Sequence, residues 1–150
     1  PGYAWAARRD FLKRIGGLFP YCILGHGDLV MAAAFSGHMP TARALWSRRY
    51  YNAHTKEWST ELKKKASAWQ HAILLGEHKI GVLPDTTLYH CYHGSIEGRK
   101  YKERGKLLAD YDPDRDVEID DAGMLRWTDA SAKELRDKVS VYFAGRAKAE

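Results

Sequence analysis

Several features that identify common classes of protein are scarce in this sequence. Cysteine occurs only as Cys22 and Cys91, with no C-x-x-C pair, which disfavours a disulfide framework and favours buried thiols in a reducing compartment. No apolar run reaches the roughly 18 residues that a membrane-spanning helix requires, and no signal peptide is visible. Internal repeats and low-complexity linkers are missing too. We therefore expect a cytoplasmic globular chain without a membrane span.

The motifs of several enzyme classes are also missing. Gly25-His26-Gly27 opens a helical segment but lacks the third glycine of a dinucleotide-binding loop, and no Walker-type loop occurs. The serines lie in no G-x-S-x-G context, so a serine nucleophile of that kind is disfavoured. His90-x-x-His93 lacks the second ligand pair of a structural zinc site, which disfavours zinc.

The composition itself is that of an ordinary globular protein. The 150 residues suffice for one domain with a core, and 45% of them are hydrophobic and 29% charged. The net charge of +5 is mild and suits an anionic ligand as well as a polyanion. Because the chain begins Pro1-Gly2-Tyr3 without an initiator methionine, we expect it to be a piece of a longer protein.

Hydrophobic spacing predicts a mixed α/β chain (an α+β fragment) in which short strands pack with a helix-rich region. Helices are expected at 10–15, 29–36, 54–73, 99–109 and 132–143, the first ending at Gly16-Gly17. One face of the longest helix should consist of Trp58, Leu62, Ala66, Trp69 and Ile73. One side of the last helix should consist of Leu135, Val139, Tyr142 and Phe143.

Strands and turns are expected between these helices. Strands are predicted at 3–7, 86–92, 117–120 and 125–127, the last two paired across a turn that holds Ala122-Gly123. Segment 18–24 should be extended and apolar. The aspartates of 112–116 are expected in a solvated turn, and Lys63-Lys64-Lys65 on a solvated helix face.

A turn with two glycines, Gly25 and Gly27, joins an apolar run to the helical run at 29–36. Glycine lets the backbone bend tightly and approach a ligand without an intervening Cβ. Asp28 follows at the start of the helix, where a carboxylate either caps free N–H groups or faces a pocket as a base. Position alone leaves both interpretations of Asp28 open.

His93 ends the predicted strand at 86–92 and precedes a glycine, so its imidazole can project from a sheet edge. A neutral imidazole is a common metal ligand, and the Arg99 and Arg104 side chains that follow suit phosphate oxygens. The alternative is that His93 is an ordinary residue at a strand end. Trp5, beside Arg8-Arg9, is either a stacking platform for a sugar or base or a core tryptophan.

Taken in order, four segments resemble the C-terminal half of a GT-A-type nucleotide-sugar glycosyltransferase of the kind found in bacteria and phages. Residues 2–9 resemble the strand that lines the sugar and acceptor floor, and 11–18 resemble the F…GG turn after it. Gly25-His26-Gly27-Asp28 resembles the family's glycine-plus-acid motif, and 92–104 resemble its late HG…R.Y..R segment. The likeness extends from about residue 2 to residue 127.

The resemblance implies transfer of a sugar from a nucleotide-diphosphate sugar to a hydroxyl of a glycan, a protein or a modified nucleic acid. It implies that Asp28 is the base or acceptor anchor and that His93 is a ligand of Mn²⁺ or Mg²⁺. The diphosphate contacts would be Arg99, Tyr101 and Arg104, and the residues that shape the sugar and acceptor pocket would be Trp5, Gly25, His26 and Gly27. Residues 1–150 would then form the acceptor- and metal-side half of a catalytic domain, in a bacterium, a phage-infected host or a virion.

The first half of such an enzyme, with its nucleotide-binding units and D-x-D metal motif, does not precede these segments. The resemblance therefore implies that this half is supplied in the same polypeptide or as a second chain. Many members of that family carry a Glu-Asp pair where this chain has Asp28 alone, so the identity of the base stays open. Whether the anomeric configuration is inverted or retained also stays open.

Two other classes stay open. The +5 charge, the basic and aromatic cluster at 41–51 and the lysines at 63–65 are compatible with a nucleic-acid-binding or virion accessory domain. Against this, the basic residues are scattered and 110–121 is strongly acidic. A structural remnant that kept the fold and lost catalysis is the third class.

Overall fold

The computed structural model describes residues 6–36, 53–76, 79, 81, 85–87, 89, 100 and 103–147. The elements are α1 (Arg9–Arg14), α2 (Gly27–Ser36), α4 (Thr60–Leu74), the 3-10 helix η1 (Lys106–Leu108), α5 (Pro113–Asp116), β1 (Val117–Ile119), β2 (Leu125–Trp127) and α6 (Lys133–Ala147). Mixed helix with a small antiparallel sheet confirms the α+β class for this part of the chain. No helix in the described ranges is both long and apolar enough to cross a membrane.

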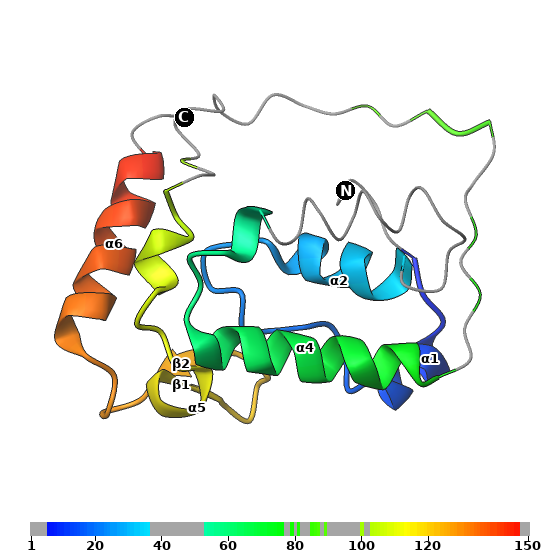
Figure 1. The fold of residues 1–150 in the computed structure, drawn as a ribbon, viewed down its shortest axis with the longest axis horizontal. Coiled ribbons are helices and arrows are strands. Elements are labelled where there is room, and N and C mark those ends of the chain that lie inside the picture. The colour runs from blue at the N-terminus through cyan, green and yellow to red at the C-terminus, as the bar shows by residue number, and fades with distance from the viewer. Residues whose placement is uncertain are drawn as a thin grey trace.

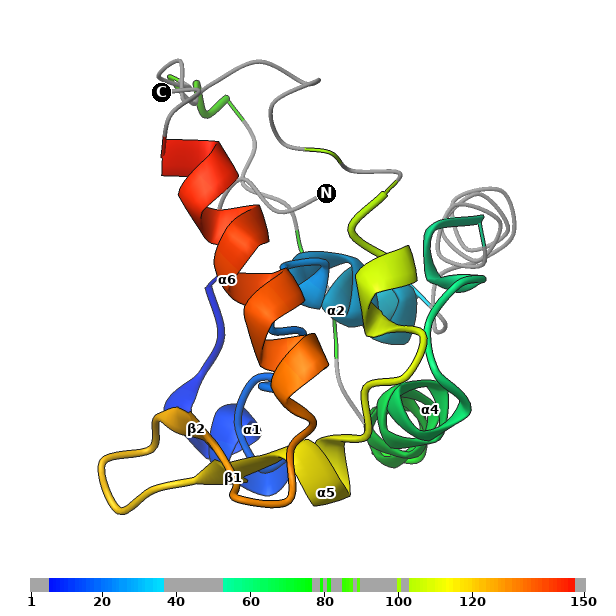
Figure 2. The ribbon, with the colours of Figure 1, turned by 90° about the vertical axis from the view of Figure 1, so that its left-hand side faces the viewer.

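Helices α2 and α4 lie side by side and form the centre of the molecule (Figure 1). In the side view of Figure 2, α4 is seen end-on, and α6 starts near the hairpin and runs upward past η1. The buried core joins these elements through Val30 of α2, Leu62 of α4, Leu108 of η1 and Val139 of α6. The core therefore lies between the helices, with the two-stranded sheet at its edge.

Helix α4 confirms most of the predicted apolar face, because Leu62, Ala66 and Ile73 are buried and Trp69 packs against the core. Trp58 is buried as well, but it lies before the helix and its assignment to the helix face is wrong. The helix begins at Thr60, however, and the prediction that it begins near His54 is wrong. The Ser59 hydroxyl caps the helix by accepting a hydrogen bond from the Leu62 N–H at 3.1 Å. A separate helical turn precedes this cap at 53–55.

The predicted end of α1 at the glycine pair is confirmed. Gly16 and Gly17 have φ values of 73° and 88°, in the left-handed region that favours glycine. The Gly17 N–H donates to the Leu12 carbonyl at 2.8 Å, which closes the last turn. The Phe11 ring lies 5.9 Å from the Phe35 ring, so α1 packs against the end of α2.

The predicted pairing of 117–120 with 125–127 is also confirmed. Strand β1 pairs antiparallel with β2, with Val117 opposite Trp127 and Ile119 opposite Leu125. The Asp120 carboxylate organises the turn by accepting the N–H groups of Ala122 and Met124 at 3.0 and 2.9 Å. All of these interactions are local, which explains why the sequence predicted them.

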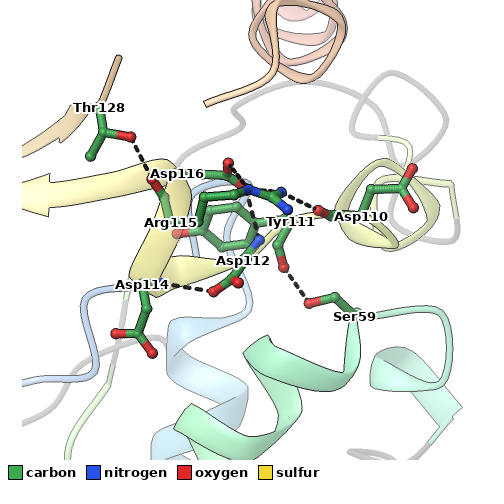
Figure 3. A network of polar contacts seen from close by, with 8 residues as sticks. All are labelled: Ser59, Asp110, Tyr111, Asp112, Asp114, Arg115, Asp116 and Thr128. Atoms are coloured by element: carbon green, nitrogen blue, oxygen red, sulfur yellow. Dashed lines mark hydrogen bonds and ion pairs between the residues drawn. The ribbon is translucent and has the colours of Figure 1, made fainter. Parts of the chain in front are cut away.

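The prediction of a solvated acidic turn at 112–116 is wrong for its last residue. Asp116, labelled in Figure 3, is completely buried, and Pro113 is buried as well. The Asp116 carboxylate accepts the Asp112 N–H at 2.8 Å and forms two hydrogen bonds with the Arg115 guanidinium at 2.8 and 2.9 Å. These hydrogen bonds replace the ones that the carboxylate loses to water when it is buried.

Helix α6 buries Leu135, Val139 and Tyr142 as predicted, but Phe143 is 46% exposed, so its inclusion on the buried side is wrong. Phe143 lies one position further around the helix, with its ring 5.3 Å from the Tyr142 ring. Segment 18–24 is irregular and turns at 23–25 rather than forming an extended segment, although Phe19 and Leu24 are buried.

The predicted strands at 3–7 and 86–92 lie largely outside the described residues. Their described members, Ala6, Ala7, Thr86, Thr87 and Tyr89, belong to no strand. Of the helix predicted at 99–109, the described part forms a turn at 103–105 followed by η1, because the carbonyls there bond three residues ahead in the 3-10 manner.

Candidate functional site

The turn that leads into α2 has the strained backbone that its glycines suggested. Gly25 has a φ of 94°, and His26 follows with a φ of 74°, which is uncommon for a residue with a side chain. The Gly25 N–H donates to the Cys22 carbonyl at 2.9 Å, and the His26 carbonyl accepts the N–H groups of Leu29 and Val30, both at 3.0 Å. The turn and the first turn of α2 thus form one hydrogen-bonded unit.

Arg104, which is distant in the sequence, packs directly onto this turn. Its Nε donates to Nε2 of His26 at 3.4 Å, across a separation of 78 residues. Its guanidinium lies against the backbone of Gly25, where a Cβ would stand only 2.9 Å from Nη1. Arg104 is 7% exposed. The absence of a side chain at Gly25 is therefore what admits the guanidinium.

Two aromatic rings also lie against His26. The His26 ring lies 5.9 Å from the His54 ring and 6.0 Å from the Trp58 ring, both edge-on. Burial, the Arg104 cation and His54 lower the pKa of His26 from 6.5 to about 3. His26 is therefore a neutral imidazole at physiological pH, and among the described residues its buried Nδ1 has no hydrogen-bond partner.

The Cys22 thiol lies close to the same charges. Burial and the Asp28 carboxylate raise its pKa, and the Arg104 cation opposes that rise. The thiol is free of a disulfide and stays protonated at neutral pH, which disfavours a nucleophilic role. The half-buried Cys22 side chain agrees in part with the buried thiol expected from the sequence, and Cys91 lies outside the described residues.

Asp28 lies within the first turn of α2, not at the position before it, which His26 occupies. A carboxylate there complements the positive end of the helix dipole without being the N-cap. Asp28 is half-buried, so its side chain retains contact with solvent. The helix-cap interpretation is thereby weakened, and the carboxylate remains available to a ligand.

The structure brings together five of the predicted site residues, namely Gly25, His26, Gly27, Asp28 and Arg104. The other four, Trp5, His93, Arg99 and Tyr101, lie outside the described residues. Sequence reasoning missed His54 as a neighbour of the site, because nothing in its local sequence indicates that contact. Trp58 was assigned to a core helix face, and its contact with His26 was not expected.

The metal site that the resemblance implies is not formed by the described residues alone. Within the ranges that the structure describes, no group of three or more His, Cys, Asp or Glu side chains converges as a metal site requires. The one assigned ligand, His93, lies outside those ranges.

No family model, curated protein or solved structure matches this chain. The function of the site is therefore inferred from its geometry and from the resemblance of the motifs.

Proposed function

We propose that this chain is the acceptor-side half of a GT-A-type glycosyltransferase that moves a sugar from a nucleotide-diphosphate sugar to an acceptor hydroxyl. The observation that supports this most directly is the contact between the Gly25–Asp28 turn and Arg104. These residues belong to two motifs that are distant in the sequence, and a shared site requires them to meet. The F…GG turn supports the same proposal, because Phe11 packs on the helix that carries Asp28.

In this proposal, Asp28 accepts the proton of the acceptor hydroxyl as its oxygen forms the new bond to the anomeric carbon. The bond from that carbon to the diphosphate breaks, and the nucleoside diphosphate leaves with the electron pair. Asp28 suits this role because it is half-buried and lies in the first turn of a helix. It also forms no hydrogen bond with the described residues that proton transfer would break. A positioned carboxylate contributes roughly 10²–10⁴-fold to such a step.

Arg104 is given a different role from the diphosphate contact that the resemblance implied. Its guanidinium is buried against Gly25 and hydrogen-bonded to His26, so we assign it to the support of the turn. Arg99 and Tyr101 retain the diphosphate role within the proposal, and Trp5 the sugar-stacking role. A divalent ion, Mn²⁺ or Mg²⁺, enters the proposal only through His93 and would neutralise the leaving diphosphate when bound.

The test is sugar transfer by the complete protein that carries this chain. Asp28→Asn should lower kcat by at least about 10²-fold and leave nucleotide-sugar binding unchanged, because the amide keeps the shape and loses the base. Asp137→Asn, an exposed position on α6, is the matched control and should transfer at the parent rate. A parent-like rate for Asp28→Asn would remove Asp28 from the mechanism.

The nucleic-acid alternative receives no support from the lysine run on α4. Lys63 Nζ donates to the Lys56 carbonyl at 2.7 Å, Lys64 Nζ bonds Glu61 at 3.0 Å, and Lys65 pairs with Asp114. Each of the three ammonium groups is thus engaged within its own chain. Steep salt-dependent binding of DNA or RNA, without binding of any nucleotide sugar, would nevertheless favour that class over ours.

A further inference from the structure

The hydrogen bonding of the buried His26 side chain is incomplete among the described residues. His26 is 5% exposed, it sits in a turn with positive φ, and its Nδ1 has no partner among the described residues. Buried polar atoms are nearly always paired in native proteins. A buried polar atom of a candidate site that has no partner among the described residues is suited to a ligand.

The contact with Arg104 determines what that atom is. A guanidinium is always protonated and has only donors, so Arg104 Nε–H donates and His26 Nε2 accepts at 3.4 Å. A neutral imidazole carries a single N–H, so a nitrogen that accepts cannot also hold the proton. The ring proton must therefore be on Nδ1, which makes the unpartnered atom a donor.

We infer that Arg104 holds His26 in its Nδ1–H tautomer, and that this N–H binds a hydroxyl oxygen of the sugar-bearing ligand. The choice of a hydroxyl rests on the proposed function, because a sugar presents hydroxyl oxygens that can accept this N–H. Arg104 is thus a positioning residue, and His26 a binding residue.

The first experiment tests the tautomer and is independent of the proposed function. In ¹⁵N-labelled protein, two-bond ring correlations distinguish a protonated nitrogen from an unprotonated one. Wild type should show His26 protonated at Nδ1 alone. Arg104→Lys keeps the cation but loses the Nε–H, and it should give a mixture of tautomers. Arg126→Lys, in β2, is the matched control and should leave His26 unchanged. An Nε2–H tautomer in wild type overturns the inference without any variant.

The second experiment tests the ligand. His26→Asn places an amide N–H near the position of Nδ1 and tolerates positive φ, whereas His26→Phe keeps a ring and has no donor. The probes are UDP-glucose and GDP-mannose, with UDP and GDP as controls that lack the sugar. His26→Phe should weaken binding of the sugar nucleotide roughly tenfold and leave the sugar-free nucleotide unaffected, as expected for one lost hydrogen bond. His26→Asn should restore most of that affinity.

The outcomes separate the two proposals. If the sugar nucleotides bind and His26→Phe binds them like the parent, the hydroxyl assignment is overturned while the glycosyltransferase proposal survives. If no sugar nucleotide binds the complete protein, the glycosyltransferase proposal fails together with the hydroxyl assignment. The tautomer is decided by the nitrogen correlations in either case.

Discussion

Gly25→Ala is the substitution that tests the turn most directly. A methyl group there would stand 2.9 Å from Nη1 of Arg104, on a backbone with a φ of 94°. The left-handed backbone costs a residue with a Cβ about 1–2 kcal/mol. Displacing the guanidinium breaks the hydrogen bond to His26, worth about 1 kcal/mol more. We therefore expect a loss of about 2–3 kcal/mol in the free energy of unfolding.

Gly17→Ala is the matched control, because the chain offers a second left-handed glycine without the packing. Gly17 has a φ of 88°, and a Cβ there would meet nothing within 4 Å. This variant should lose only the part of the unfolding free energy that comes from the left-handed backbone, about 1–2 kcal/mol. The difference between the two variants isolates the contribution of Arg104.

The measurement is urea unfolding followed by far-ultraviolet circular dichroism, with melting temperatures as a second readout. A loss of 2–3 kcal/mol should lower Tm by roughly 5–10 °C for a chain of this size. In an Arg104→Lys background, the cost of Gly25→Ala should fall to that of Gly17→Ala. Equal costs for Gly25→Ala and Gly17→Ala in the parent background would refute the packing argument.

Three further predictions follow from the described contacts. Ser59→Ala should cost about 1–2 kcal/mol in urea unfolding, because the hydroxyl caps α4 and donates to the Tyr111 carbonyl. Leu62→Ala should cost about 2–5 kcal/mol by the same assay, since Leu62 is fully buried in the core; a loss below 1 kcal/mol would mean that the core is looser than described. The pKa of His26 is lowered to about 3, so the unfolded chain takes up the proton first. Stability should therefore be complete above about pH 6.5 and decline as the pH falls toward 3. His26→Asn should flatten this decline when urea midpoints are compared at about pH 7 and about pH 4.5. The exposed His71→Asn should keep the parent slope.

The structural elements that were predicted correctly follow from patterns among residues close in the sequence. The hairpin from Val117 to Trp127 follows from alternating residues around a turn, and the end of α1 follows from Gly16-Gly17. The buried face of α4 follows from its three- and four-residue spacing. In the hairpin and at the end of α1 the stabilising contacts lie within about ten residues. In α4 the spacing of the apolar residues is itself a local pattern, although the face packs on distant elements.

The predictions that failed depend on contacts between distant elements or on the details of capping. Asp116 was expected in solvent because its neighbours are charged, yet the packing of α5 buries it and Arg115 compensates. The start of α4 was misplaced because Ser59 caps the helix after the apolar pattern has already begun at Trp58. Phe143 was assigned to the wrong side because a helix that packs along one narrow stripe buries fewer positions than its apolar residues suggest.

The sequence by itself determined the turn: two glycines, a histidine and an aspartate at the start of α2, with the backbone freedom that such a turn needs. Only the tertiary structure decided that the Arg104 side chain is buried against that turn instead of being exposed at the protein surface. The physical reason is that a hydrogen bond across 78 residues depends on how the intervening helices pack, and local patterns do not encode that geometry. The same contact decided which nitrogen of His26 accepts and which carries the proton.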